Sequence, residues 1–218
     1  IVRTEKLETP SSAPIVHHIR YDDLFNVRGF IDPEGNEKIQ TFDRRGRVTR
    51  VSDPDAGNIT FDYDAMGNIV REENGAGRVV RREYDEQGRM VAEYEDGNRE
   101  ATERLFFYDR HPECAASLCQ NLGSMLAGQT FAAGDLGTVD ERLSYNSHGS
   151  INRTERIIRG KSMVFETDYD NADRLVAERF PGGLELTYTL DGIGRFTSVP
   201  GYVTDIQHNA NGIVESFT

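Results

Sequence analysis

The sequence has no tryptophan, few cysteines and no long apolar run, and each of these absences excludes a class of protein. Only two of its 218 residues are cysteines, Cys114 and Cys119, which is too few for a disulfide-dense scaffold. No apolar run approaches the roughly 20 residues that a membrane helix needs, so we expect no membrane span. The chain begins at Ile1 and carries no signal peptide, so we interpret it as an excised or processed piece of a longer protein.

Positive charge is also scarce. The chain holds 25 Lys and Arg against 37 Asp and Glu, which gives a formal net charge of −12. Nucleic acids and anionic membranes are polyanions, so we expect neither as a partner. Hydrophobic residues make up 37% of the chain and 21 residues are glycine, which favours a folded protein with many turns and a modest core.

An aromatic residue followed by Asp recurs every 21 residues in the first half of the chain, which indicates a repeat protein. In three of the four copies a Gly stands four residues after the aromatic residue, followed by Arg or Asn and then by an apolar residue. The first copy departs from this pattern, with Phe25-Asn26-Val27 at the corresponding place. The residues that define the motif, with two looser copies further on, are Tyr21, Asp22, Phe42, Asp43, Gly46, Arg47, Tyr63, Asp64, Gly67, Asn68, Tyr84, Asp85, Gly88, Arg89, Tyr145, Gly149, Tyr169 and Asp170.

Each repeat contains two turn signals separated by runs of about five to seven residues, which is typical of one β-hairpin per repeat. An Asp or Asn shortly before a Gly favours a turn, because the Asp side chain bonds nearby backbone and Gly adopts positive φ. Lys38 and Gln40 occupy the positions that Ile59 and Phe61 hold in the next repeat. We therefore expect an all-β array of antiparallel hairpins that is in contact with water on both faces.

The period divides the chain into four parts. We expect a lead-in segment at 1–20, regular repeats at 21–108, an insertion at 109–144 and degenerate repeats at 145–218. Within the insertion, apolar residues at helical spacing predict one short helix near 113–127, which either caps a gap in the sheet or contacts a partner component; these residues are Leu118, Leu122, Met125 and Leu126.

The motif Tyr-Asp-x-x-Gly-[Arg/Asn]-apolar resembles that of the YD-repeat, or RHS-repeat, family, and the resemblance extends from about Tyr21 to Phe217. It implies hairpins joined into a curved, spiralling antiparallel sheet that forms part of a hollow shell. Such shells occur in bacterial insecticidal Tc complexes, in RHS polymorphic toxins and in the extracellular barrel of teneurins. The tail of the sequence looks most like the bacterial toxin versions.

The resemblance also implies a function. We expect a non-catalytic segment of a shell that encloses and protects a toxin polypeptide in a secreted bacterial toxin. Its partners would be the remainder of its own shell and the enclosed toxin domain, and its location secreted or extracellular. The alternative is an extracellular adhesion module of teneurin type that binds a carbohydrate or a receptor. Because Ile206 to Thr218 carries little charge, we also expect self-association through a terminal strand.

Catalytic chemistry finds little support in the residues. RHS proteins cleave themselves near an Asp-Pro-x-Gly-Leu motif, and Asp32-Pro33-Glu34-Gly35 is similar but is followed by Asn36. We interpret this segment, and Asp53-Pro54, as connecting turns. Gly75-Ala76-Gly77 precedes an expected strand and therefore does not fit a phosphate-binding loop. We predict no catalytic residue and no cofactor.

Metal sites are equally unsupported. His111, Cys114 and Cys119 are three zinc-ligand types without a fourth at a standard spacing. Asp53, Asp55 and Asn58 crowd one turn but lack the bidentate Glu of a calcium loop; we therefore predict no metal. The spacing of the two cysteines leaves open whether they form one local disulfide or remain separate thiols.

Overall fold

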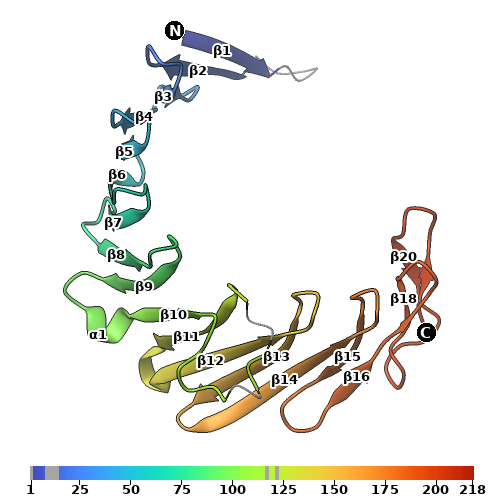
Figure 1. Ribbon diagram of the computed structural model, residues 1–218. Helices are drawn as coiled ribbons and strands as arrows, with labels where there is room; N and C mark the ends of the chain where they lie inside the picture. Colours follow the sequence, from blue (N-terminus) through green and yellow to red (C-terminus); the bar gives the residue numbers. More distant parts are fainter. Residues whose placement is uncertain (1, 8–14, 116–117, 121–122) are drawn as a thin grey trace. The chain divides into compact units, whose positions relative to one another are not determined.

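The computed structural model describes residues 2–7, 15–115, 118–120 and 123–218, and it is almost entirely β-structure (Figure 1). The chain forms two compact units, Ile1–Glu103 and Arg104–Thr218. No helix in the described part of the chain is long and apolar enough to cross a membrane.

In the first unit, consecutive strands pair antiparallel in chain order, so that every neighbouring pair is a hairpin. A one-turn helix, α1 (Arg99–Thr102), follows the last strand. The strands are β1 (Val2–Leu7), β2 (Ile15–Tyr21), β3 (Val27–Ile31), β4 (Glu37–Phe42), β5 (Val48–Asp53), β6 (Gly57–Tyr63), β7 (Ile69–Glu73), β8 (Val79–Tyr84) and β9 (Met90–Glu95).

The repeat glycines lie at equivalent turns between these strands. Gly46, Gly67 and Gly88 all have positive φ, at 78°, 101° and 79°. A side chain with a Cβ rarely adopts this conformation, which explains why the motif contains Gly there. In the first repeat Phe25 takes the corresponding place and has φ 63°, so the turn is kept although the sequence departs from the motif. The predicted all-β array of antiparallel hairpins is confirmed.

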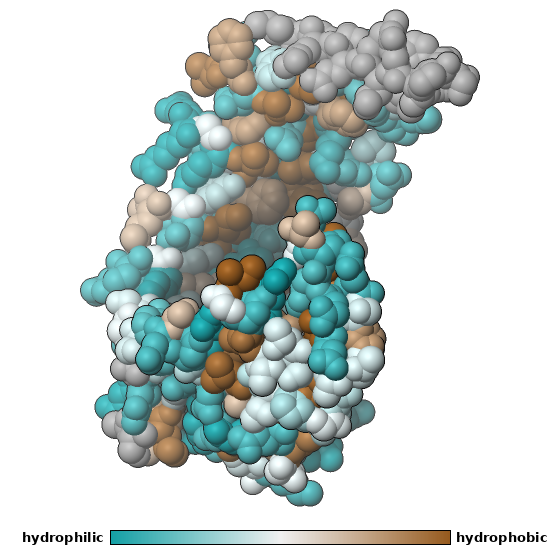
Figure 2. All heavy atoms as spheres, turned by 90° about the vertical axis from the view of Figure 1, so that its right-hand side faces the viewer, coloured by the Kyte–Doolittle hydropathy of each residue, from teal (hydrophilic) through white to brown (hydrophobic). Residues whose placement is uncertain are grey.

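Both faces of the sheet in the first unit are partly open to water. Every residue of β7 and β8 is half-buried, on one face as on the other. Arg82 of β8 reaches across its neighbours and pairs with Glu72 at 3.0 Å and Glu93 at 2.9 Å. Figure 2 shows apolar side chains interspersed with polar ones over the face that it presents. Such a sheet is stabilised mainly by cross-strand pairs, because it has little buried apolar surface.

The second unit continues the same antiparallel order from β10 to β16 and ends in two small hairpins. A short 3-10 turn (Gly134–Leu136) connects two of its strands. The strands are β10 (Arg104–Tyr108), β11 (Leu126–Ala132), β12 (Thr138–Tyr145), β13 (Ile151–Ile158), β14 (Lys161–Tyr169), β15 (Leu175–Arg179), β16 (Glu185–Thr187), β17 (Thr189–Leu190), β18 (Phe196–Ser198), β19 (Gln207–His208) and β20 (Val214–Ser216).

A small hydrophobic core lies in this second unit. Ala127, Leu143 and Tyr145 are buried together. Phe107, Cys119, Met125 and Leu126 pack against them. The core therefore forms where the segment between β10 and β11 folds back onto the sheet.

The short helix predicted near 113–127 is wrong for the residues that are described there. Residues 113–114 and 118–119 lie in turns, and Leu126 begins β11, while Leu122 lies outside the described residues. Ser124 has φ 65°, which a helix does not permit. Met125 and Leu126 face the small core, so their apolar character reflects the packing of a loop and a strand end.

Candidate functional site

Each repeat turn is closed by its aspartate. Asp43 Oδ1 accepts hydrogen bonds from the backbone N–H of Arg45 at 2.8 Å and of Arg47 at 3.0 Å. Arg47 Nε donates to Asp43 Oδ2 at 2.7 Å. The same aspartate-to-residue i+4 pair recurs along the chain: Asp22–Asn26, Asp32–Asn36, Asp64–Asn68, Asp85–Arg89, Asp170–Arg174 and Asp191–Arg195. These turns thus use an Asp and a donor side chain four residues later, whereas at Asn146 and Asn209 the amide oxygen accepts the same two backbone N–H groups.

These turns keep their carboxylates ionised. Hydrogen bonds from the side chain and the backbone N–H of Arg174 lower the pKa of Asp170 to about 2. Backbone and side-chain hydrogen bonds from Arg195 lower the pKa of Asp191 to about 2 as well. A carboxylate that is paired and ionised in this way is a structural group and a poor general acid or base near neutral pH.

The tyrosine of the motif links neighbouring repeats. Tyr63 donates its hydroxyl to the carbonyl of Val48 at 2.6 Å, and Tyr84 donates to Ile69 at 2.9 Å. In both cases the acceptor stands 15 residues earlier and is the first residue of a strand in the preceding repeat. In the second unit Tyr145 donates to Leu126 and Tyr169 to Ile151. The sequence reasoning missed these acceptors, although their constant spacing in the first unit is visible in the repeat.

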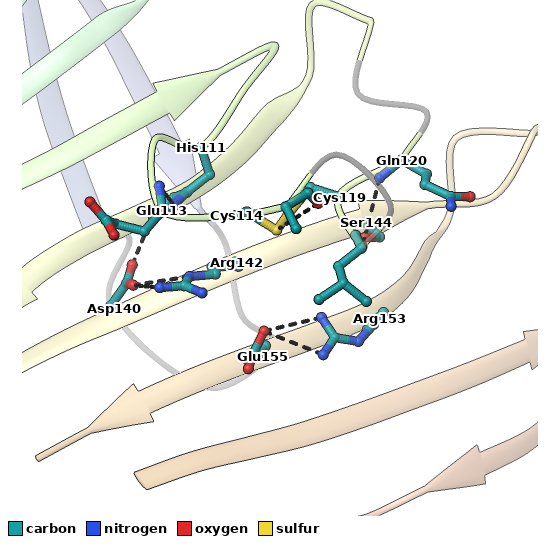
Figure 3. Close-up of a disulfide and its surroundings, with 12 residues drawn as sticks. His111, Glu113, Cys114, Cys119, Gln120, Asp140, Arg142, Ser144, Arg153 and Glu155 are labelled. Carbon is teal, nitrogen blue, oxygen red and sulfur yellow. Dashed lines mark hydrogen bonds and ion pairs between the residues drawn. A yellow bond between two sulfur atoms is a disulfide. The ribbon is translucent and has the colours of Figure 1, made fainter. Parts of the chain in front are cut away.

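The segment between β10 and β11 is closed by a disulfide between Cys114 and Cys119, and we call residues 111–120 the disulfide loop (Figure 3). Ser144 of β12 anchors it, accepting a hydrogen bond from the backbone N–H of Gln120 and donating to the carbonyl of Leu118. The backbone N–H of Tyr145 also donates to the Gln120 carbonyl at 3.2 Å. The loop is thereby fixed against the end of β12.

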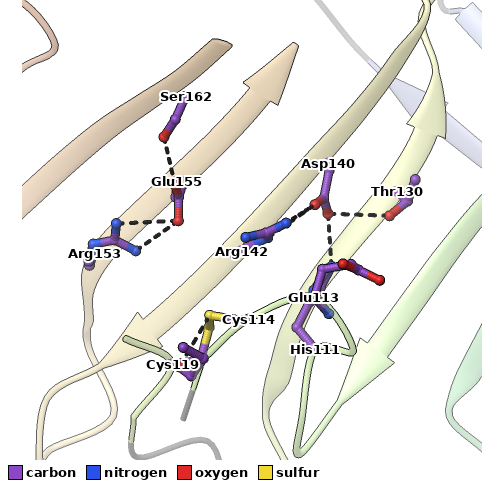
Figure 4. Close-up of polar contacts among 11 residues, drawn as sticks. His111, Glu113, Cys114, Cys119, Thr130, Asp140, Arg142, Arg153, Glu155 and Ser162 are labelled. Atoms are coloured by element: carbon purple, nitrogen blue, oxygen red, sulfur yellow. Dashed lines mark hydrogen bonds and ion pairs between the residues drawn. A yellow bond between two sulfur atoms is a disulfide. The ribbon is translucent and has the colours of Figure 1, made fainter. Parts of the chain in front are cut away.

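A fully buried histidine lies at the start of this loop. His111 Nδ1 accepts the backbone N–H of Glu113 at 3.2 Å, and Nε2 lies 2.9 Å from Asp140 Oδ1, at an angle poor for a hydrogen bond (Figure 4). Arg142 binds the other oxygen of Asp140 at 2.7 Å. Burial lowers the pKa of His111 more than Asp140 raises it, so the ring favours the neutral form.

Two further ion pairs lie on the neighbouring strands, Arg153 with Glu155 and Arg156 with Glu141. Glu155 accepts hydrogen bonds from Ser162 at 2.6 Å and from Arg153 at 3.2 Å, and these lower its pKa (Figure 4). Among the described residues no group of three or more His, Cys, Asp or Glu side chains could hold a metal ion. His111, Cys114 and Cys119 were considered as zinc ligands from the sequence. The two cysteines do not offer thiolates to a metal here, because their sulfurs are joined in a disulfide.

The Asp-Pro segments lie in turns. The Gly35 N–H donates to the Asp32 carbonyl at 3.1 Å, and Asp32 binds Asn36 as the repeat aspartates bind their partners. Asp53 Oδ1 accepts the N–H groups of Asp55 and Ala56, both at 3.0 Å. Both carboxylates therefore hold turns, as we expected from the sequence.

The motif residues do not gather into one site. They are distributed along the array, one set for each hairpin, and the turn and tyrosine hydrogen bonds repeat with them. Buried polar and apolar groups come together where the disulfide loop lies against the sheet, with His111 and Cys114 from the loop and Ala127, Leu143 and Ser144 from β11 and β12. Within each unit the geometry offers a hydrogen-bonded antiparallel sheet whose repeats are joined by side chains.

Known proteins share this architecture. The crystal structure of TcdB2-TccC3-TEV matches with a TM-score of 0.76 at 14% identity, and the Tc holotoxin pore of Photorhabdus luminescens matches with 0.76 at 15% identity. Each alignment covers 98% of this chain, which spans only 12% of the length of either relative. At this identity the likeness shows the fold alone. Comparison with curated proteins gives no match.

The family is shown by the sequence itself. Residues 13–209, which include all the repeat motifs described above, match the family described as Teneurin YD-shell. This match covers most of the chain, and the hairpin array agrees with it. The chain therefore belongs to the teneurin YD-shell family, and its function is of shell type.

Proposed function

We propose that this chain is part of the wall of a shell that encloses and protects a toxin polypeptide in a secreted bacterial toxin. The observation that carries the proposal is the succession of antiparallel hairpins within each unit, in which tyrosines bond one repeat to the carbonyl of the repeat before it. The family and the fold shared with Tc toxin structures support a shell. That this shell encloses a toxin polypeptide goes beyond the family and the fold and is our proposal.

The physical mechanism is steric. Inner strands of the array use their backbone N–H and C=O groups on their neighbours, so they offer an enclosed polypeptide no edge to pair with. Half-exposed faces with paired charges suit a wall that has water on both sides. The remainder of the same shell would pair with the terminal strands, and two copies of the isolated chain would pair through them as well.

The test uses the full-length parent protein and a protease. We expect the enclosed polypeptide to resist proteinase K until the wall is opened. Gly128→Ala opens the wall because a Cβ at this position would overlap the Glu141 carbonyl of the neighbouring strand. Glu86→Ala, in an exposed turn, is the matched control. Equal digestion of the polypeptide in the intact protein and in Gly128→Ala would refute enclosure.

Two further parts of the proposal have separate tests. Recovery of the full-length protein from the culture medium of its source would support secretion, and its confinement to the cell interior would refute it. Sedimentation velocity of the isolated chain across a concentration series tests self-association, and a strict monomer at the highest concentration would refute that part.

A further inference from the structure

The disulfide between Cys114 and Cys119 lies between β10 and β11, and its two cysteines stand 5 positions apart in the sequence. Disulfides persist in oxidising surroundings such as the extracellular medium, whereas cytosolic reductants keep thiols reduced. Cys119 is half-buried beside the exposed Leu118 and Gln120, while Cys114 is buried, so a reductant reaches the sulfur of Cys119 first. The bond can therefore be present in one environment and absent in another.

The bridge holds three residues, Leu118 to Gln120, against the end of β12, and we call them the covering segment (Figure 3). The hydroxyl of Ser144 accepts the backbone N–H of Gln120 at 3.4 Å and donates to the carbonyl of Leu118. The backbone N–H of Tyr145 donates to the Gln120 carbonyl at 3.2 Å. The covering segment is thus attached to β12 through its own backbone.

The covering segment lies over the small core of the second unit. Cys119 packs against the buried residues of that core, which are Ala127, Leu143 and Tyr145. The sheet beneath has its own hydrogen bonds, since β11, β12 and β13 pair with one another in antiparallel register. In the first unit, hairpins of the same kind stand with a single buried hydrophobic residue, Ala92, among residues 17–103. Loss of the covering segment should therefore leave the sheet folded and expose the core.

The bridge decides whether the covering segment stays in place. The hydrogen bond from Gln120 to Ser144 is long, and any single hydrogen bond adds little net stability, because water replaces it when the segment opens. By contrast, chain entropy predicts that a bridge over so short a separation makes opening about thirtyfold rarer. The closed and open states therefore differ chiefly by one covalent bond.

We propose that the disulfide is a redox switch, and that a dithiol reductant frees the covering segment and uncovers the core. A thiolate of the reductant attacks Cys119 Sγ, the sulfur–sulfur bond breaks, and Cys114 leaves as a thiolate. The second thiol of the reductant then displaces Cys119 from the mixed disulfide. Each leaving thiolate takes up the proton that the attacking thiol released, so the reductant becomes a disulfide and both cysteines become thiols.

This switch is a property of the second unit and does not require enclosure. Only the place where it would act rests on the proposed function, because a secreted protein meets a reducing interior only when it enters a cell. The switch and the enclosure can thus fail independently.

The test is hydrogen exchange at constant pH on the full-length parent protein, with and without dithiothreitol and, separately, reduced thioredoxin. We expect both dithiols to speed exchange of the Gln120 and Tyr145 amides about thirtyfold, because both amides bond across the covering segment. Exchange in β13 and β14 and the far-ultraviolet circular dichroism should not change. The double variant Cys114→Ser, Cys119→Ser should exchange at the fast rate in either condition, which separates loss of the bridge from any other action of the reductant.

Three results would overturn the proposal. These are two free thiols, counted by mass after alkylation, without faster exchange at Gln120 and Tyr145; loss of the β-sheet signal on reduction; and resistance of the bond to reduced thioredoxin. If the double variant does not fold, reoxidation of the reduced wild type with oxidised glutathione decides the matter. Slow exchange at both amides must then return, and its failure to return would count against a switch.

Discussion

The two units are built from one repeat but are stabilised in different ways. Within residues 17–103 the only buried hydrophobic residue is Ala92. The described part of the second unit buries several more: Cys114, Ala127, Val139, Leu143, Tyr145 and Ala177. A regular YD array therefore does not need a core, and a core appears where an additional segment covers the sheet.

In the first unit the stabilising contacts are small and numerous. Each turn has its aspartate hydrogen bonds, and Tyr63 and Tyr84 add one bond each to the preceding repeat. A single hydrogen bond contributes about 1 kcal/mol, and exposed ion pairs contribute less. Loss of one contact should thus be local and modest in the first unit, whereas loss of packing in the second unit should affect many residues at once.

The largest expected difference in stability between the units comes from replacing Gly128 or Gly75 by Ala, because at either position the added Cβ would overlap a backbone carbonyl. A Cβ at Gly128 would overlap the Glu141 carbonyl and the His111 ring, inside the packed region. A Cβ at Gly75 would overlap the Ala56 carbonyl, but Gly75 lies in an exposed turn that can shift. We expect Gly128→Ala to lower the free energy of unfolding by about 3 kcal/mol and Gly75→Ala by about 1 kcal/mol. Chemical denaturation measures both, and equal losses would contradict the comparison.

Removal of the disulfide should affect the second unit alone. The bridge between Cys114 and Cys119 closes a short loop, for which chain entropy predicts a stabilisation of about 2 kcal/mol. The double variant Cys114→Ser, Cys119→Ser should increase hydrogen exchange in β11 and β12 and leave β4 to β8 unchanged. The wild type in dithiothreitol should behave like the variant. Increased exchange in the first unit would show that the loop stabilises more than its own surroundings.

Acid should also weaken the second unit first, through His111. Burial lowers the pKa of this histidine in the folded state, while the unfolded chain has the ordinary value near 6.5. Below about pH 6.5 the unfolded state takes up the proton first, so the stability present above that pH is lost as the pH falls. The protection factors of β11 and β12, which are corrected for the intrinsic pH dependence of amide exchange, should fall as the pH is lowered from 7.5 to 5.5. His111→Gln should remove this dependence and His208→Gln should keep it, and a dependence that persists in His111→Gln would exclude this cause.

The sequence predicted the regular unit far better than the insertion, for a physical reason. Positive φ at Gly46, Gly67 and Gly88 and the aspartate turns are local, and local geometry leaves a period in the sequence. The packing of Met125 onto the core depends on strands distant in sequence, and its apolar spacing resembled a helix.

The smallest effect tests whether the tyrosine bonds in the first unit follow a rule. Tyr63 and Tyr84 each bond the carbonyl 15 residues earlier, and the residue in that relation to Phe42 is Val27, the first residue of β3. Phe42 has the aromatic ring without the hydroxyl. Phe42→Tyr should therefore add the missing bond and raise the free energy of unfolding by about 0.5 to 1 kcal/mol.

Two matched variants make this test decisive. Tyr84→Phe removes an existing bond to Ile69 and should lower the free energy of unfolding by a similar amount, about 1 kcal/mol. Phe30→Tyr adds a hydroxyl to an exposed ring that stacks on His17 and should change nothing. Denaturant titration of the three variants gives the comparison. A gain in Phe30→Tyr equal to that in Phe42→Tyr would mean that added polarity stabilises the sheet without any bond to Val27. A loss in Tyr84→Phe with no gain in Phe42→Tyr would mean that the first repeats lack the regular spacing, because the bond forms only where the acceptor carbonyl lies within reach of the ring.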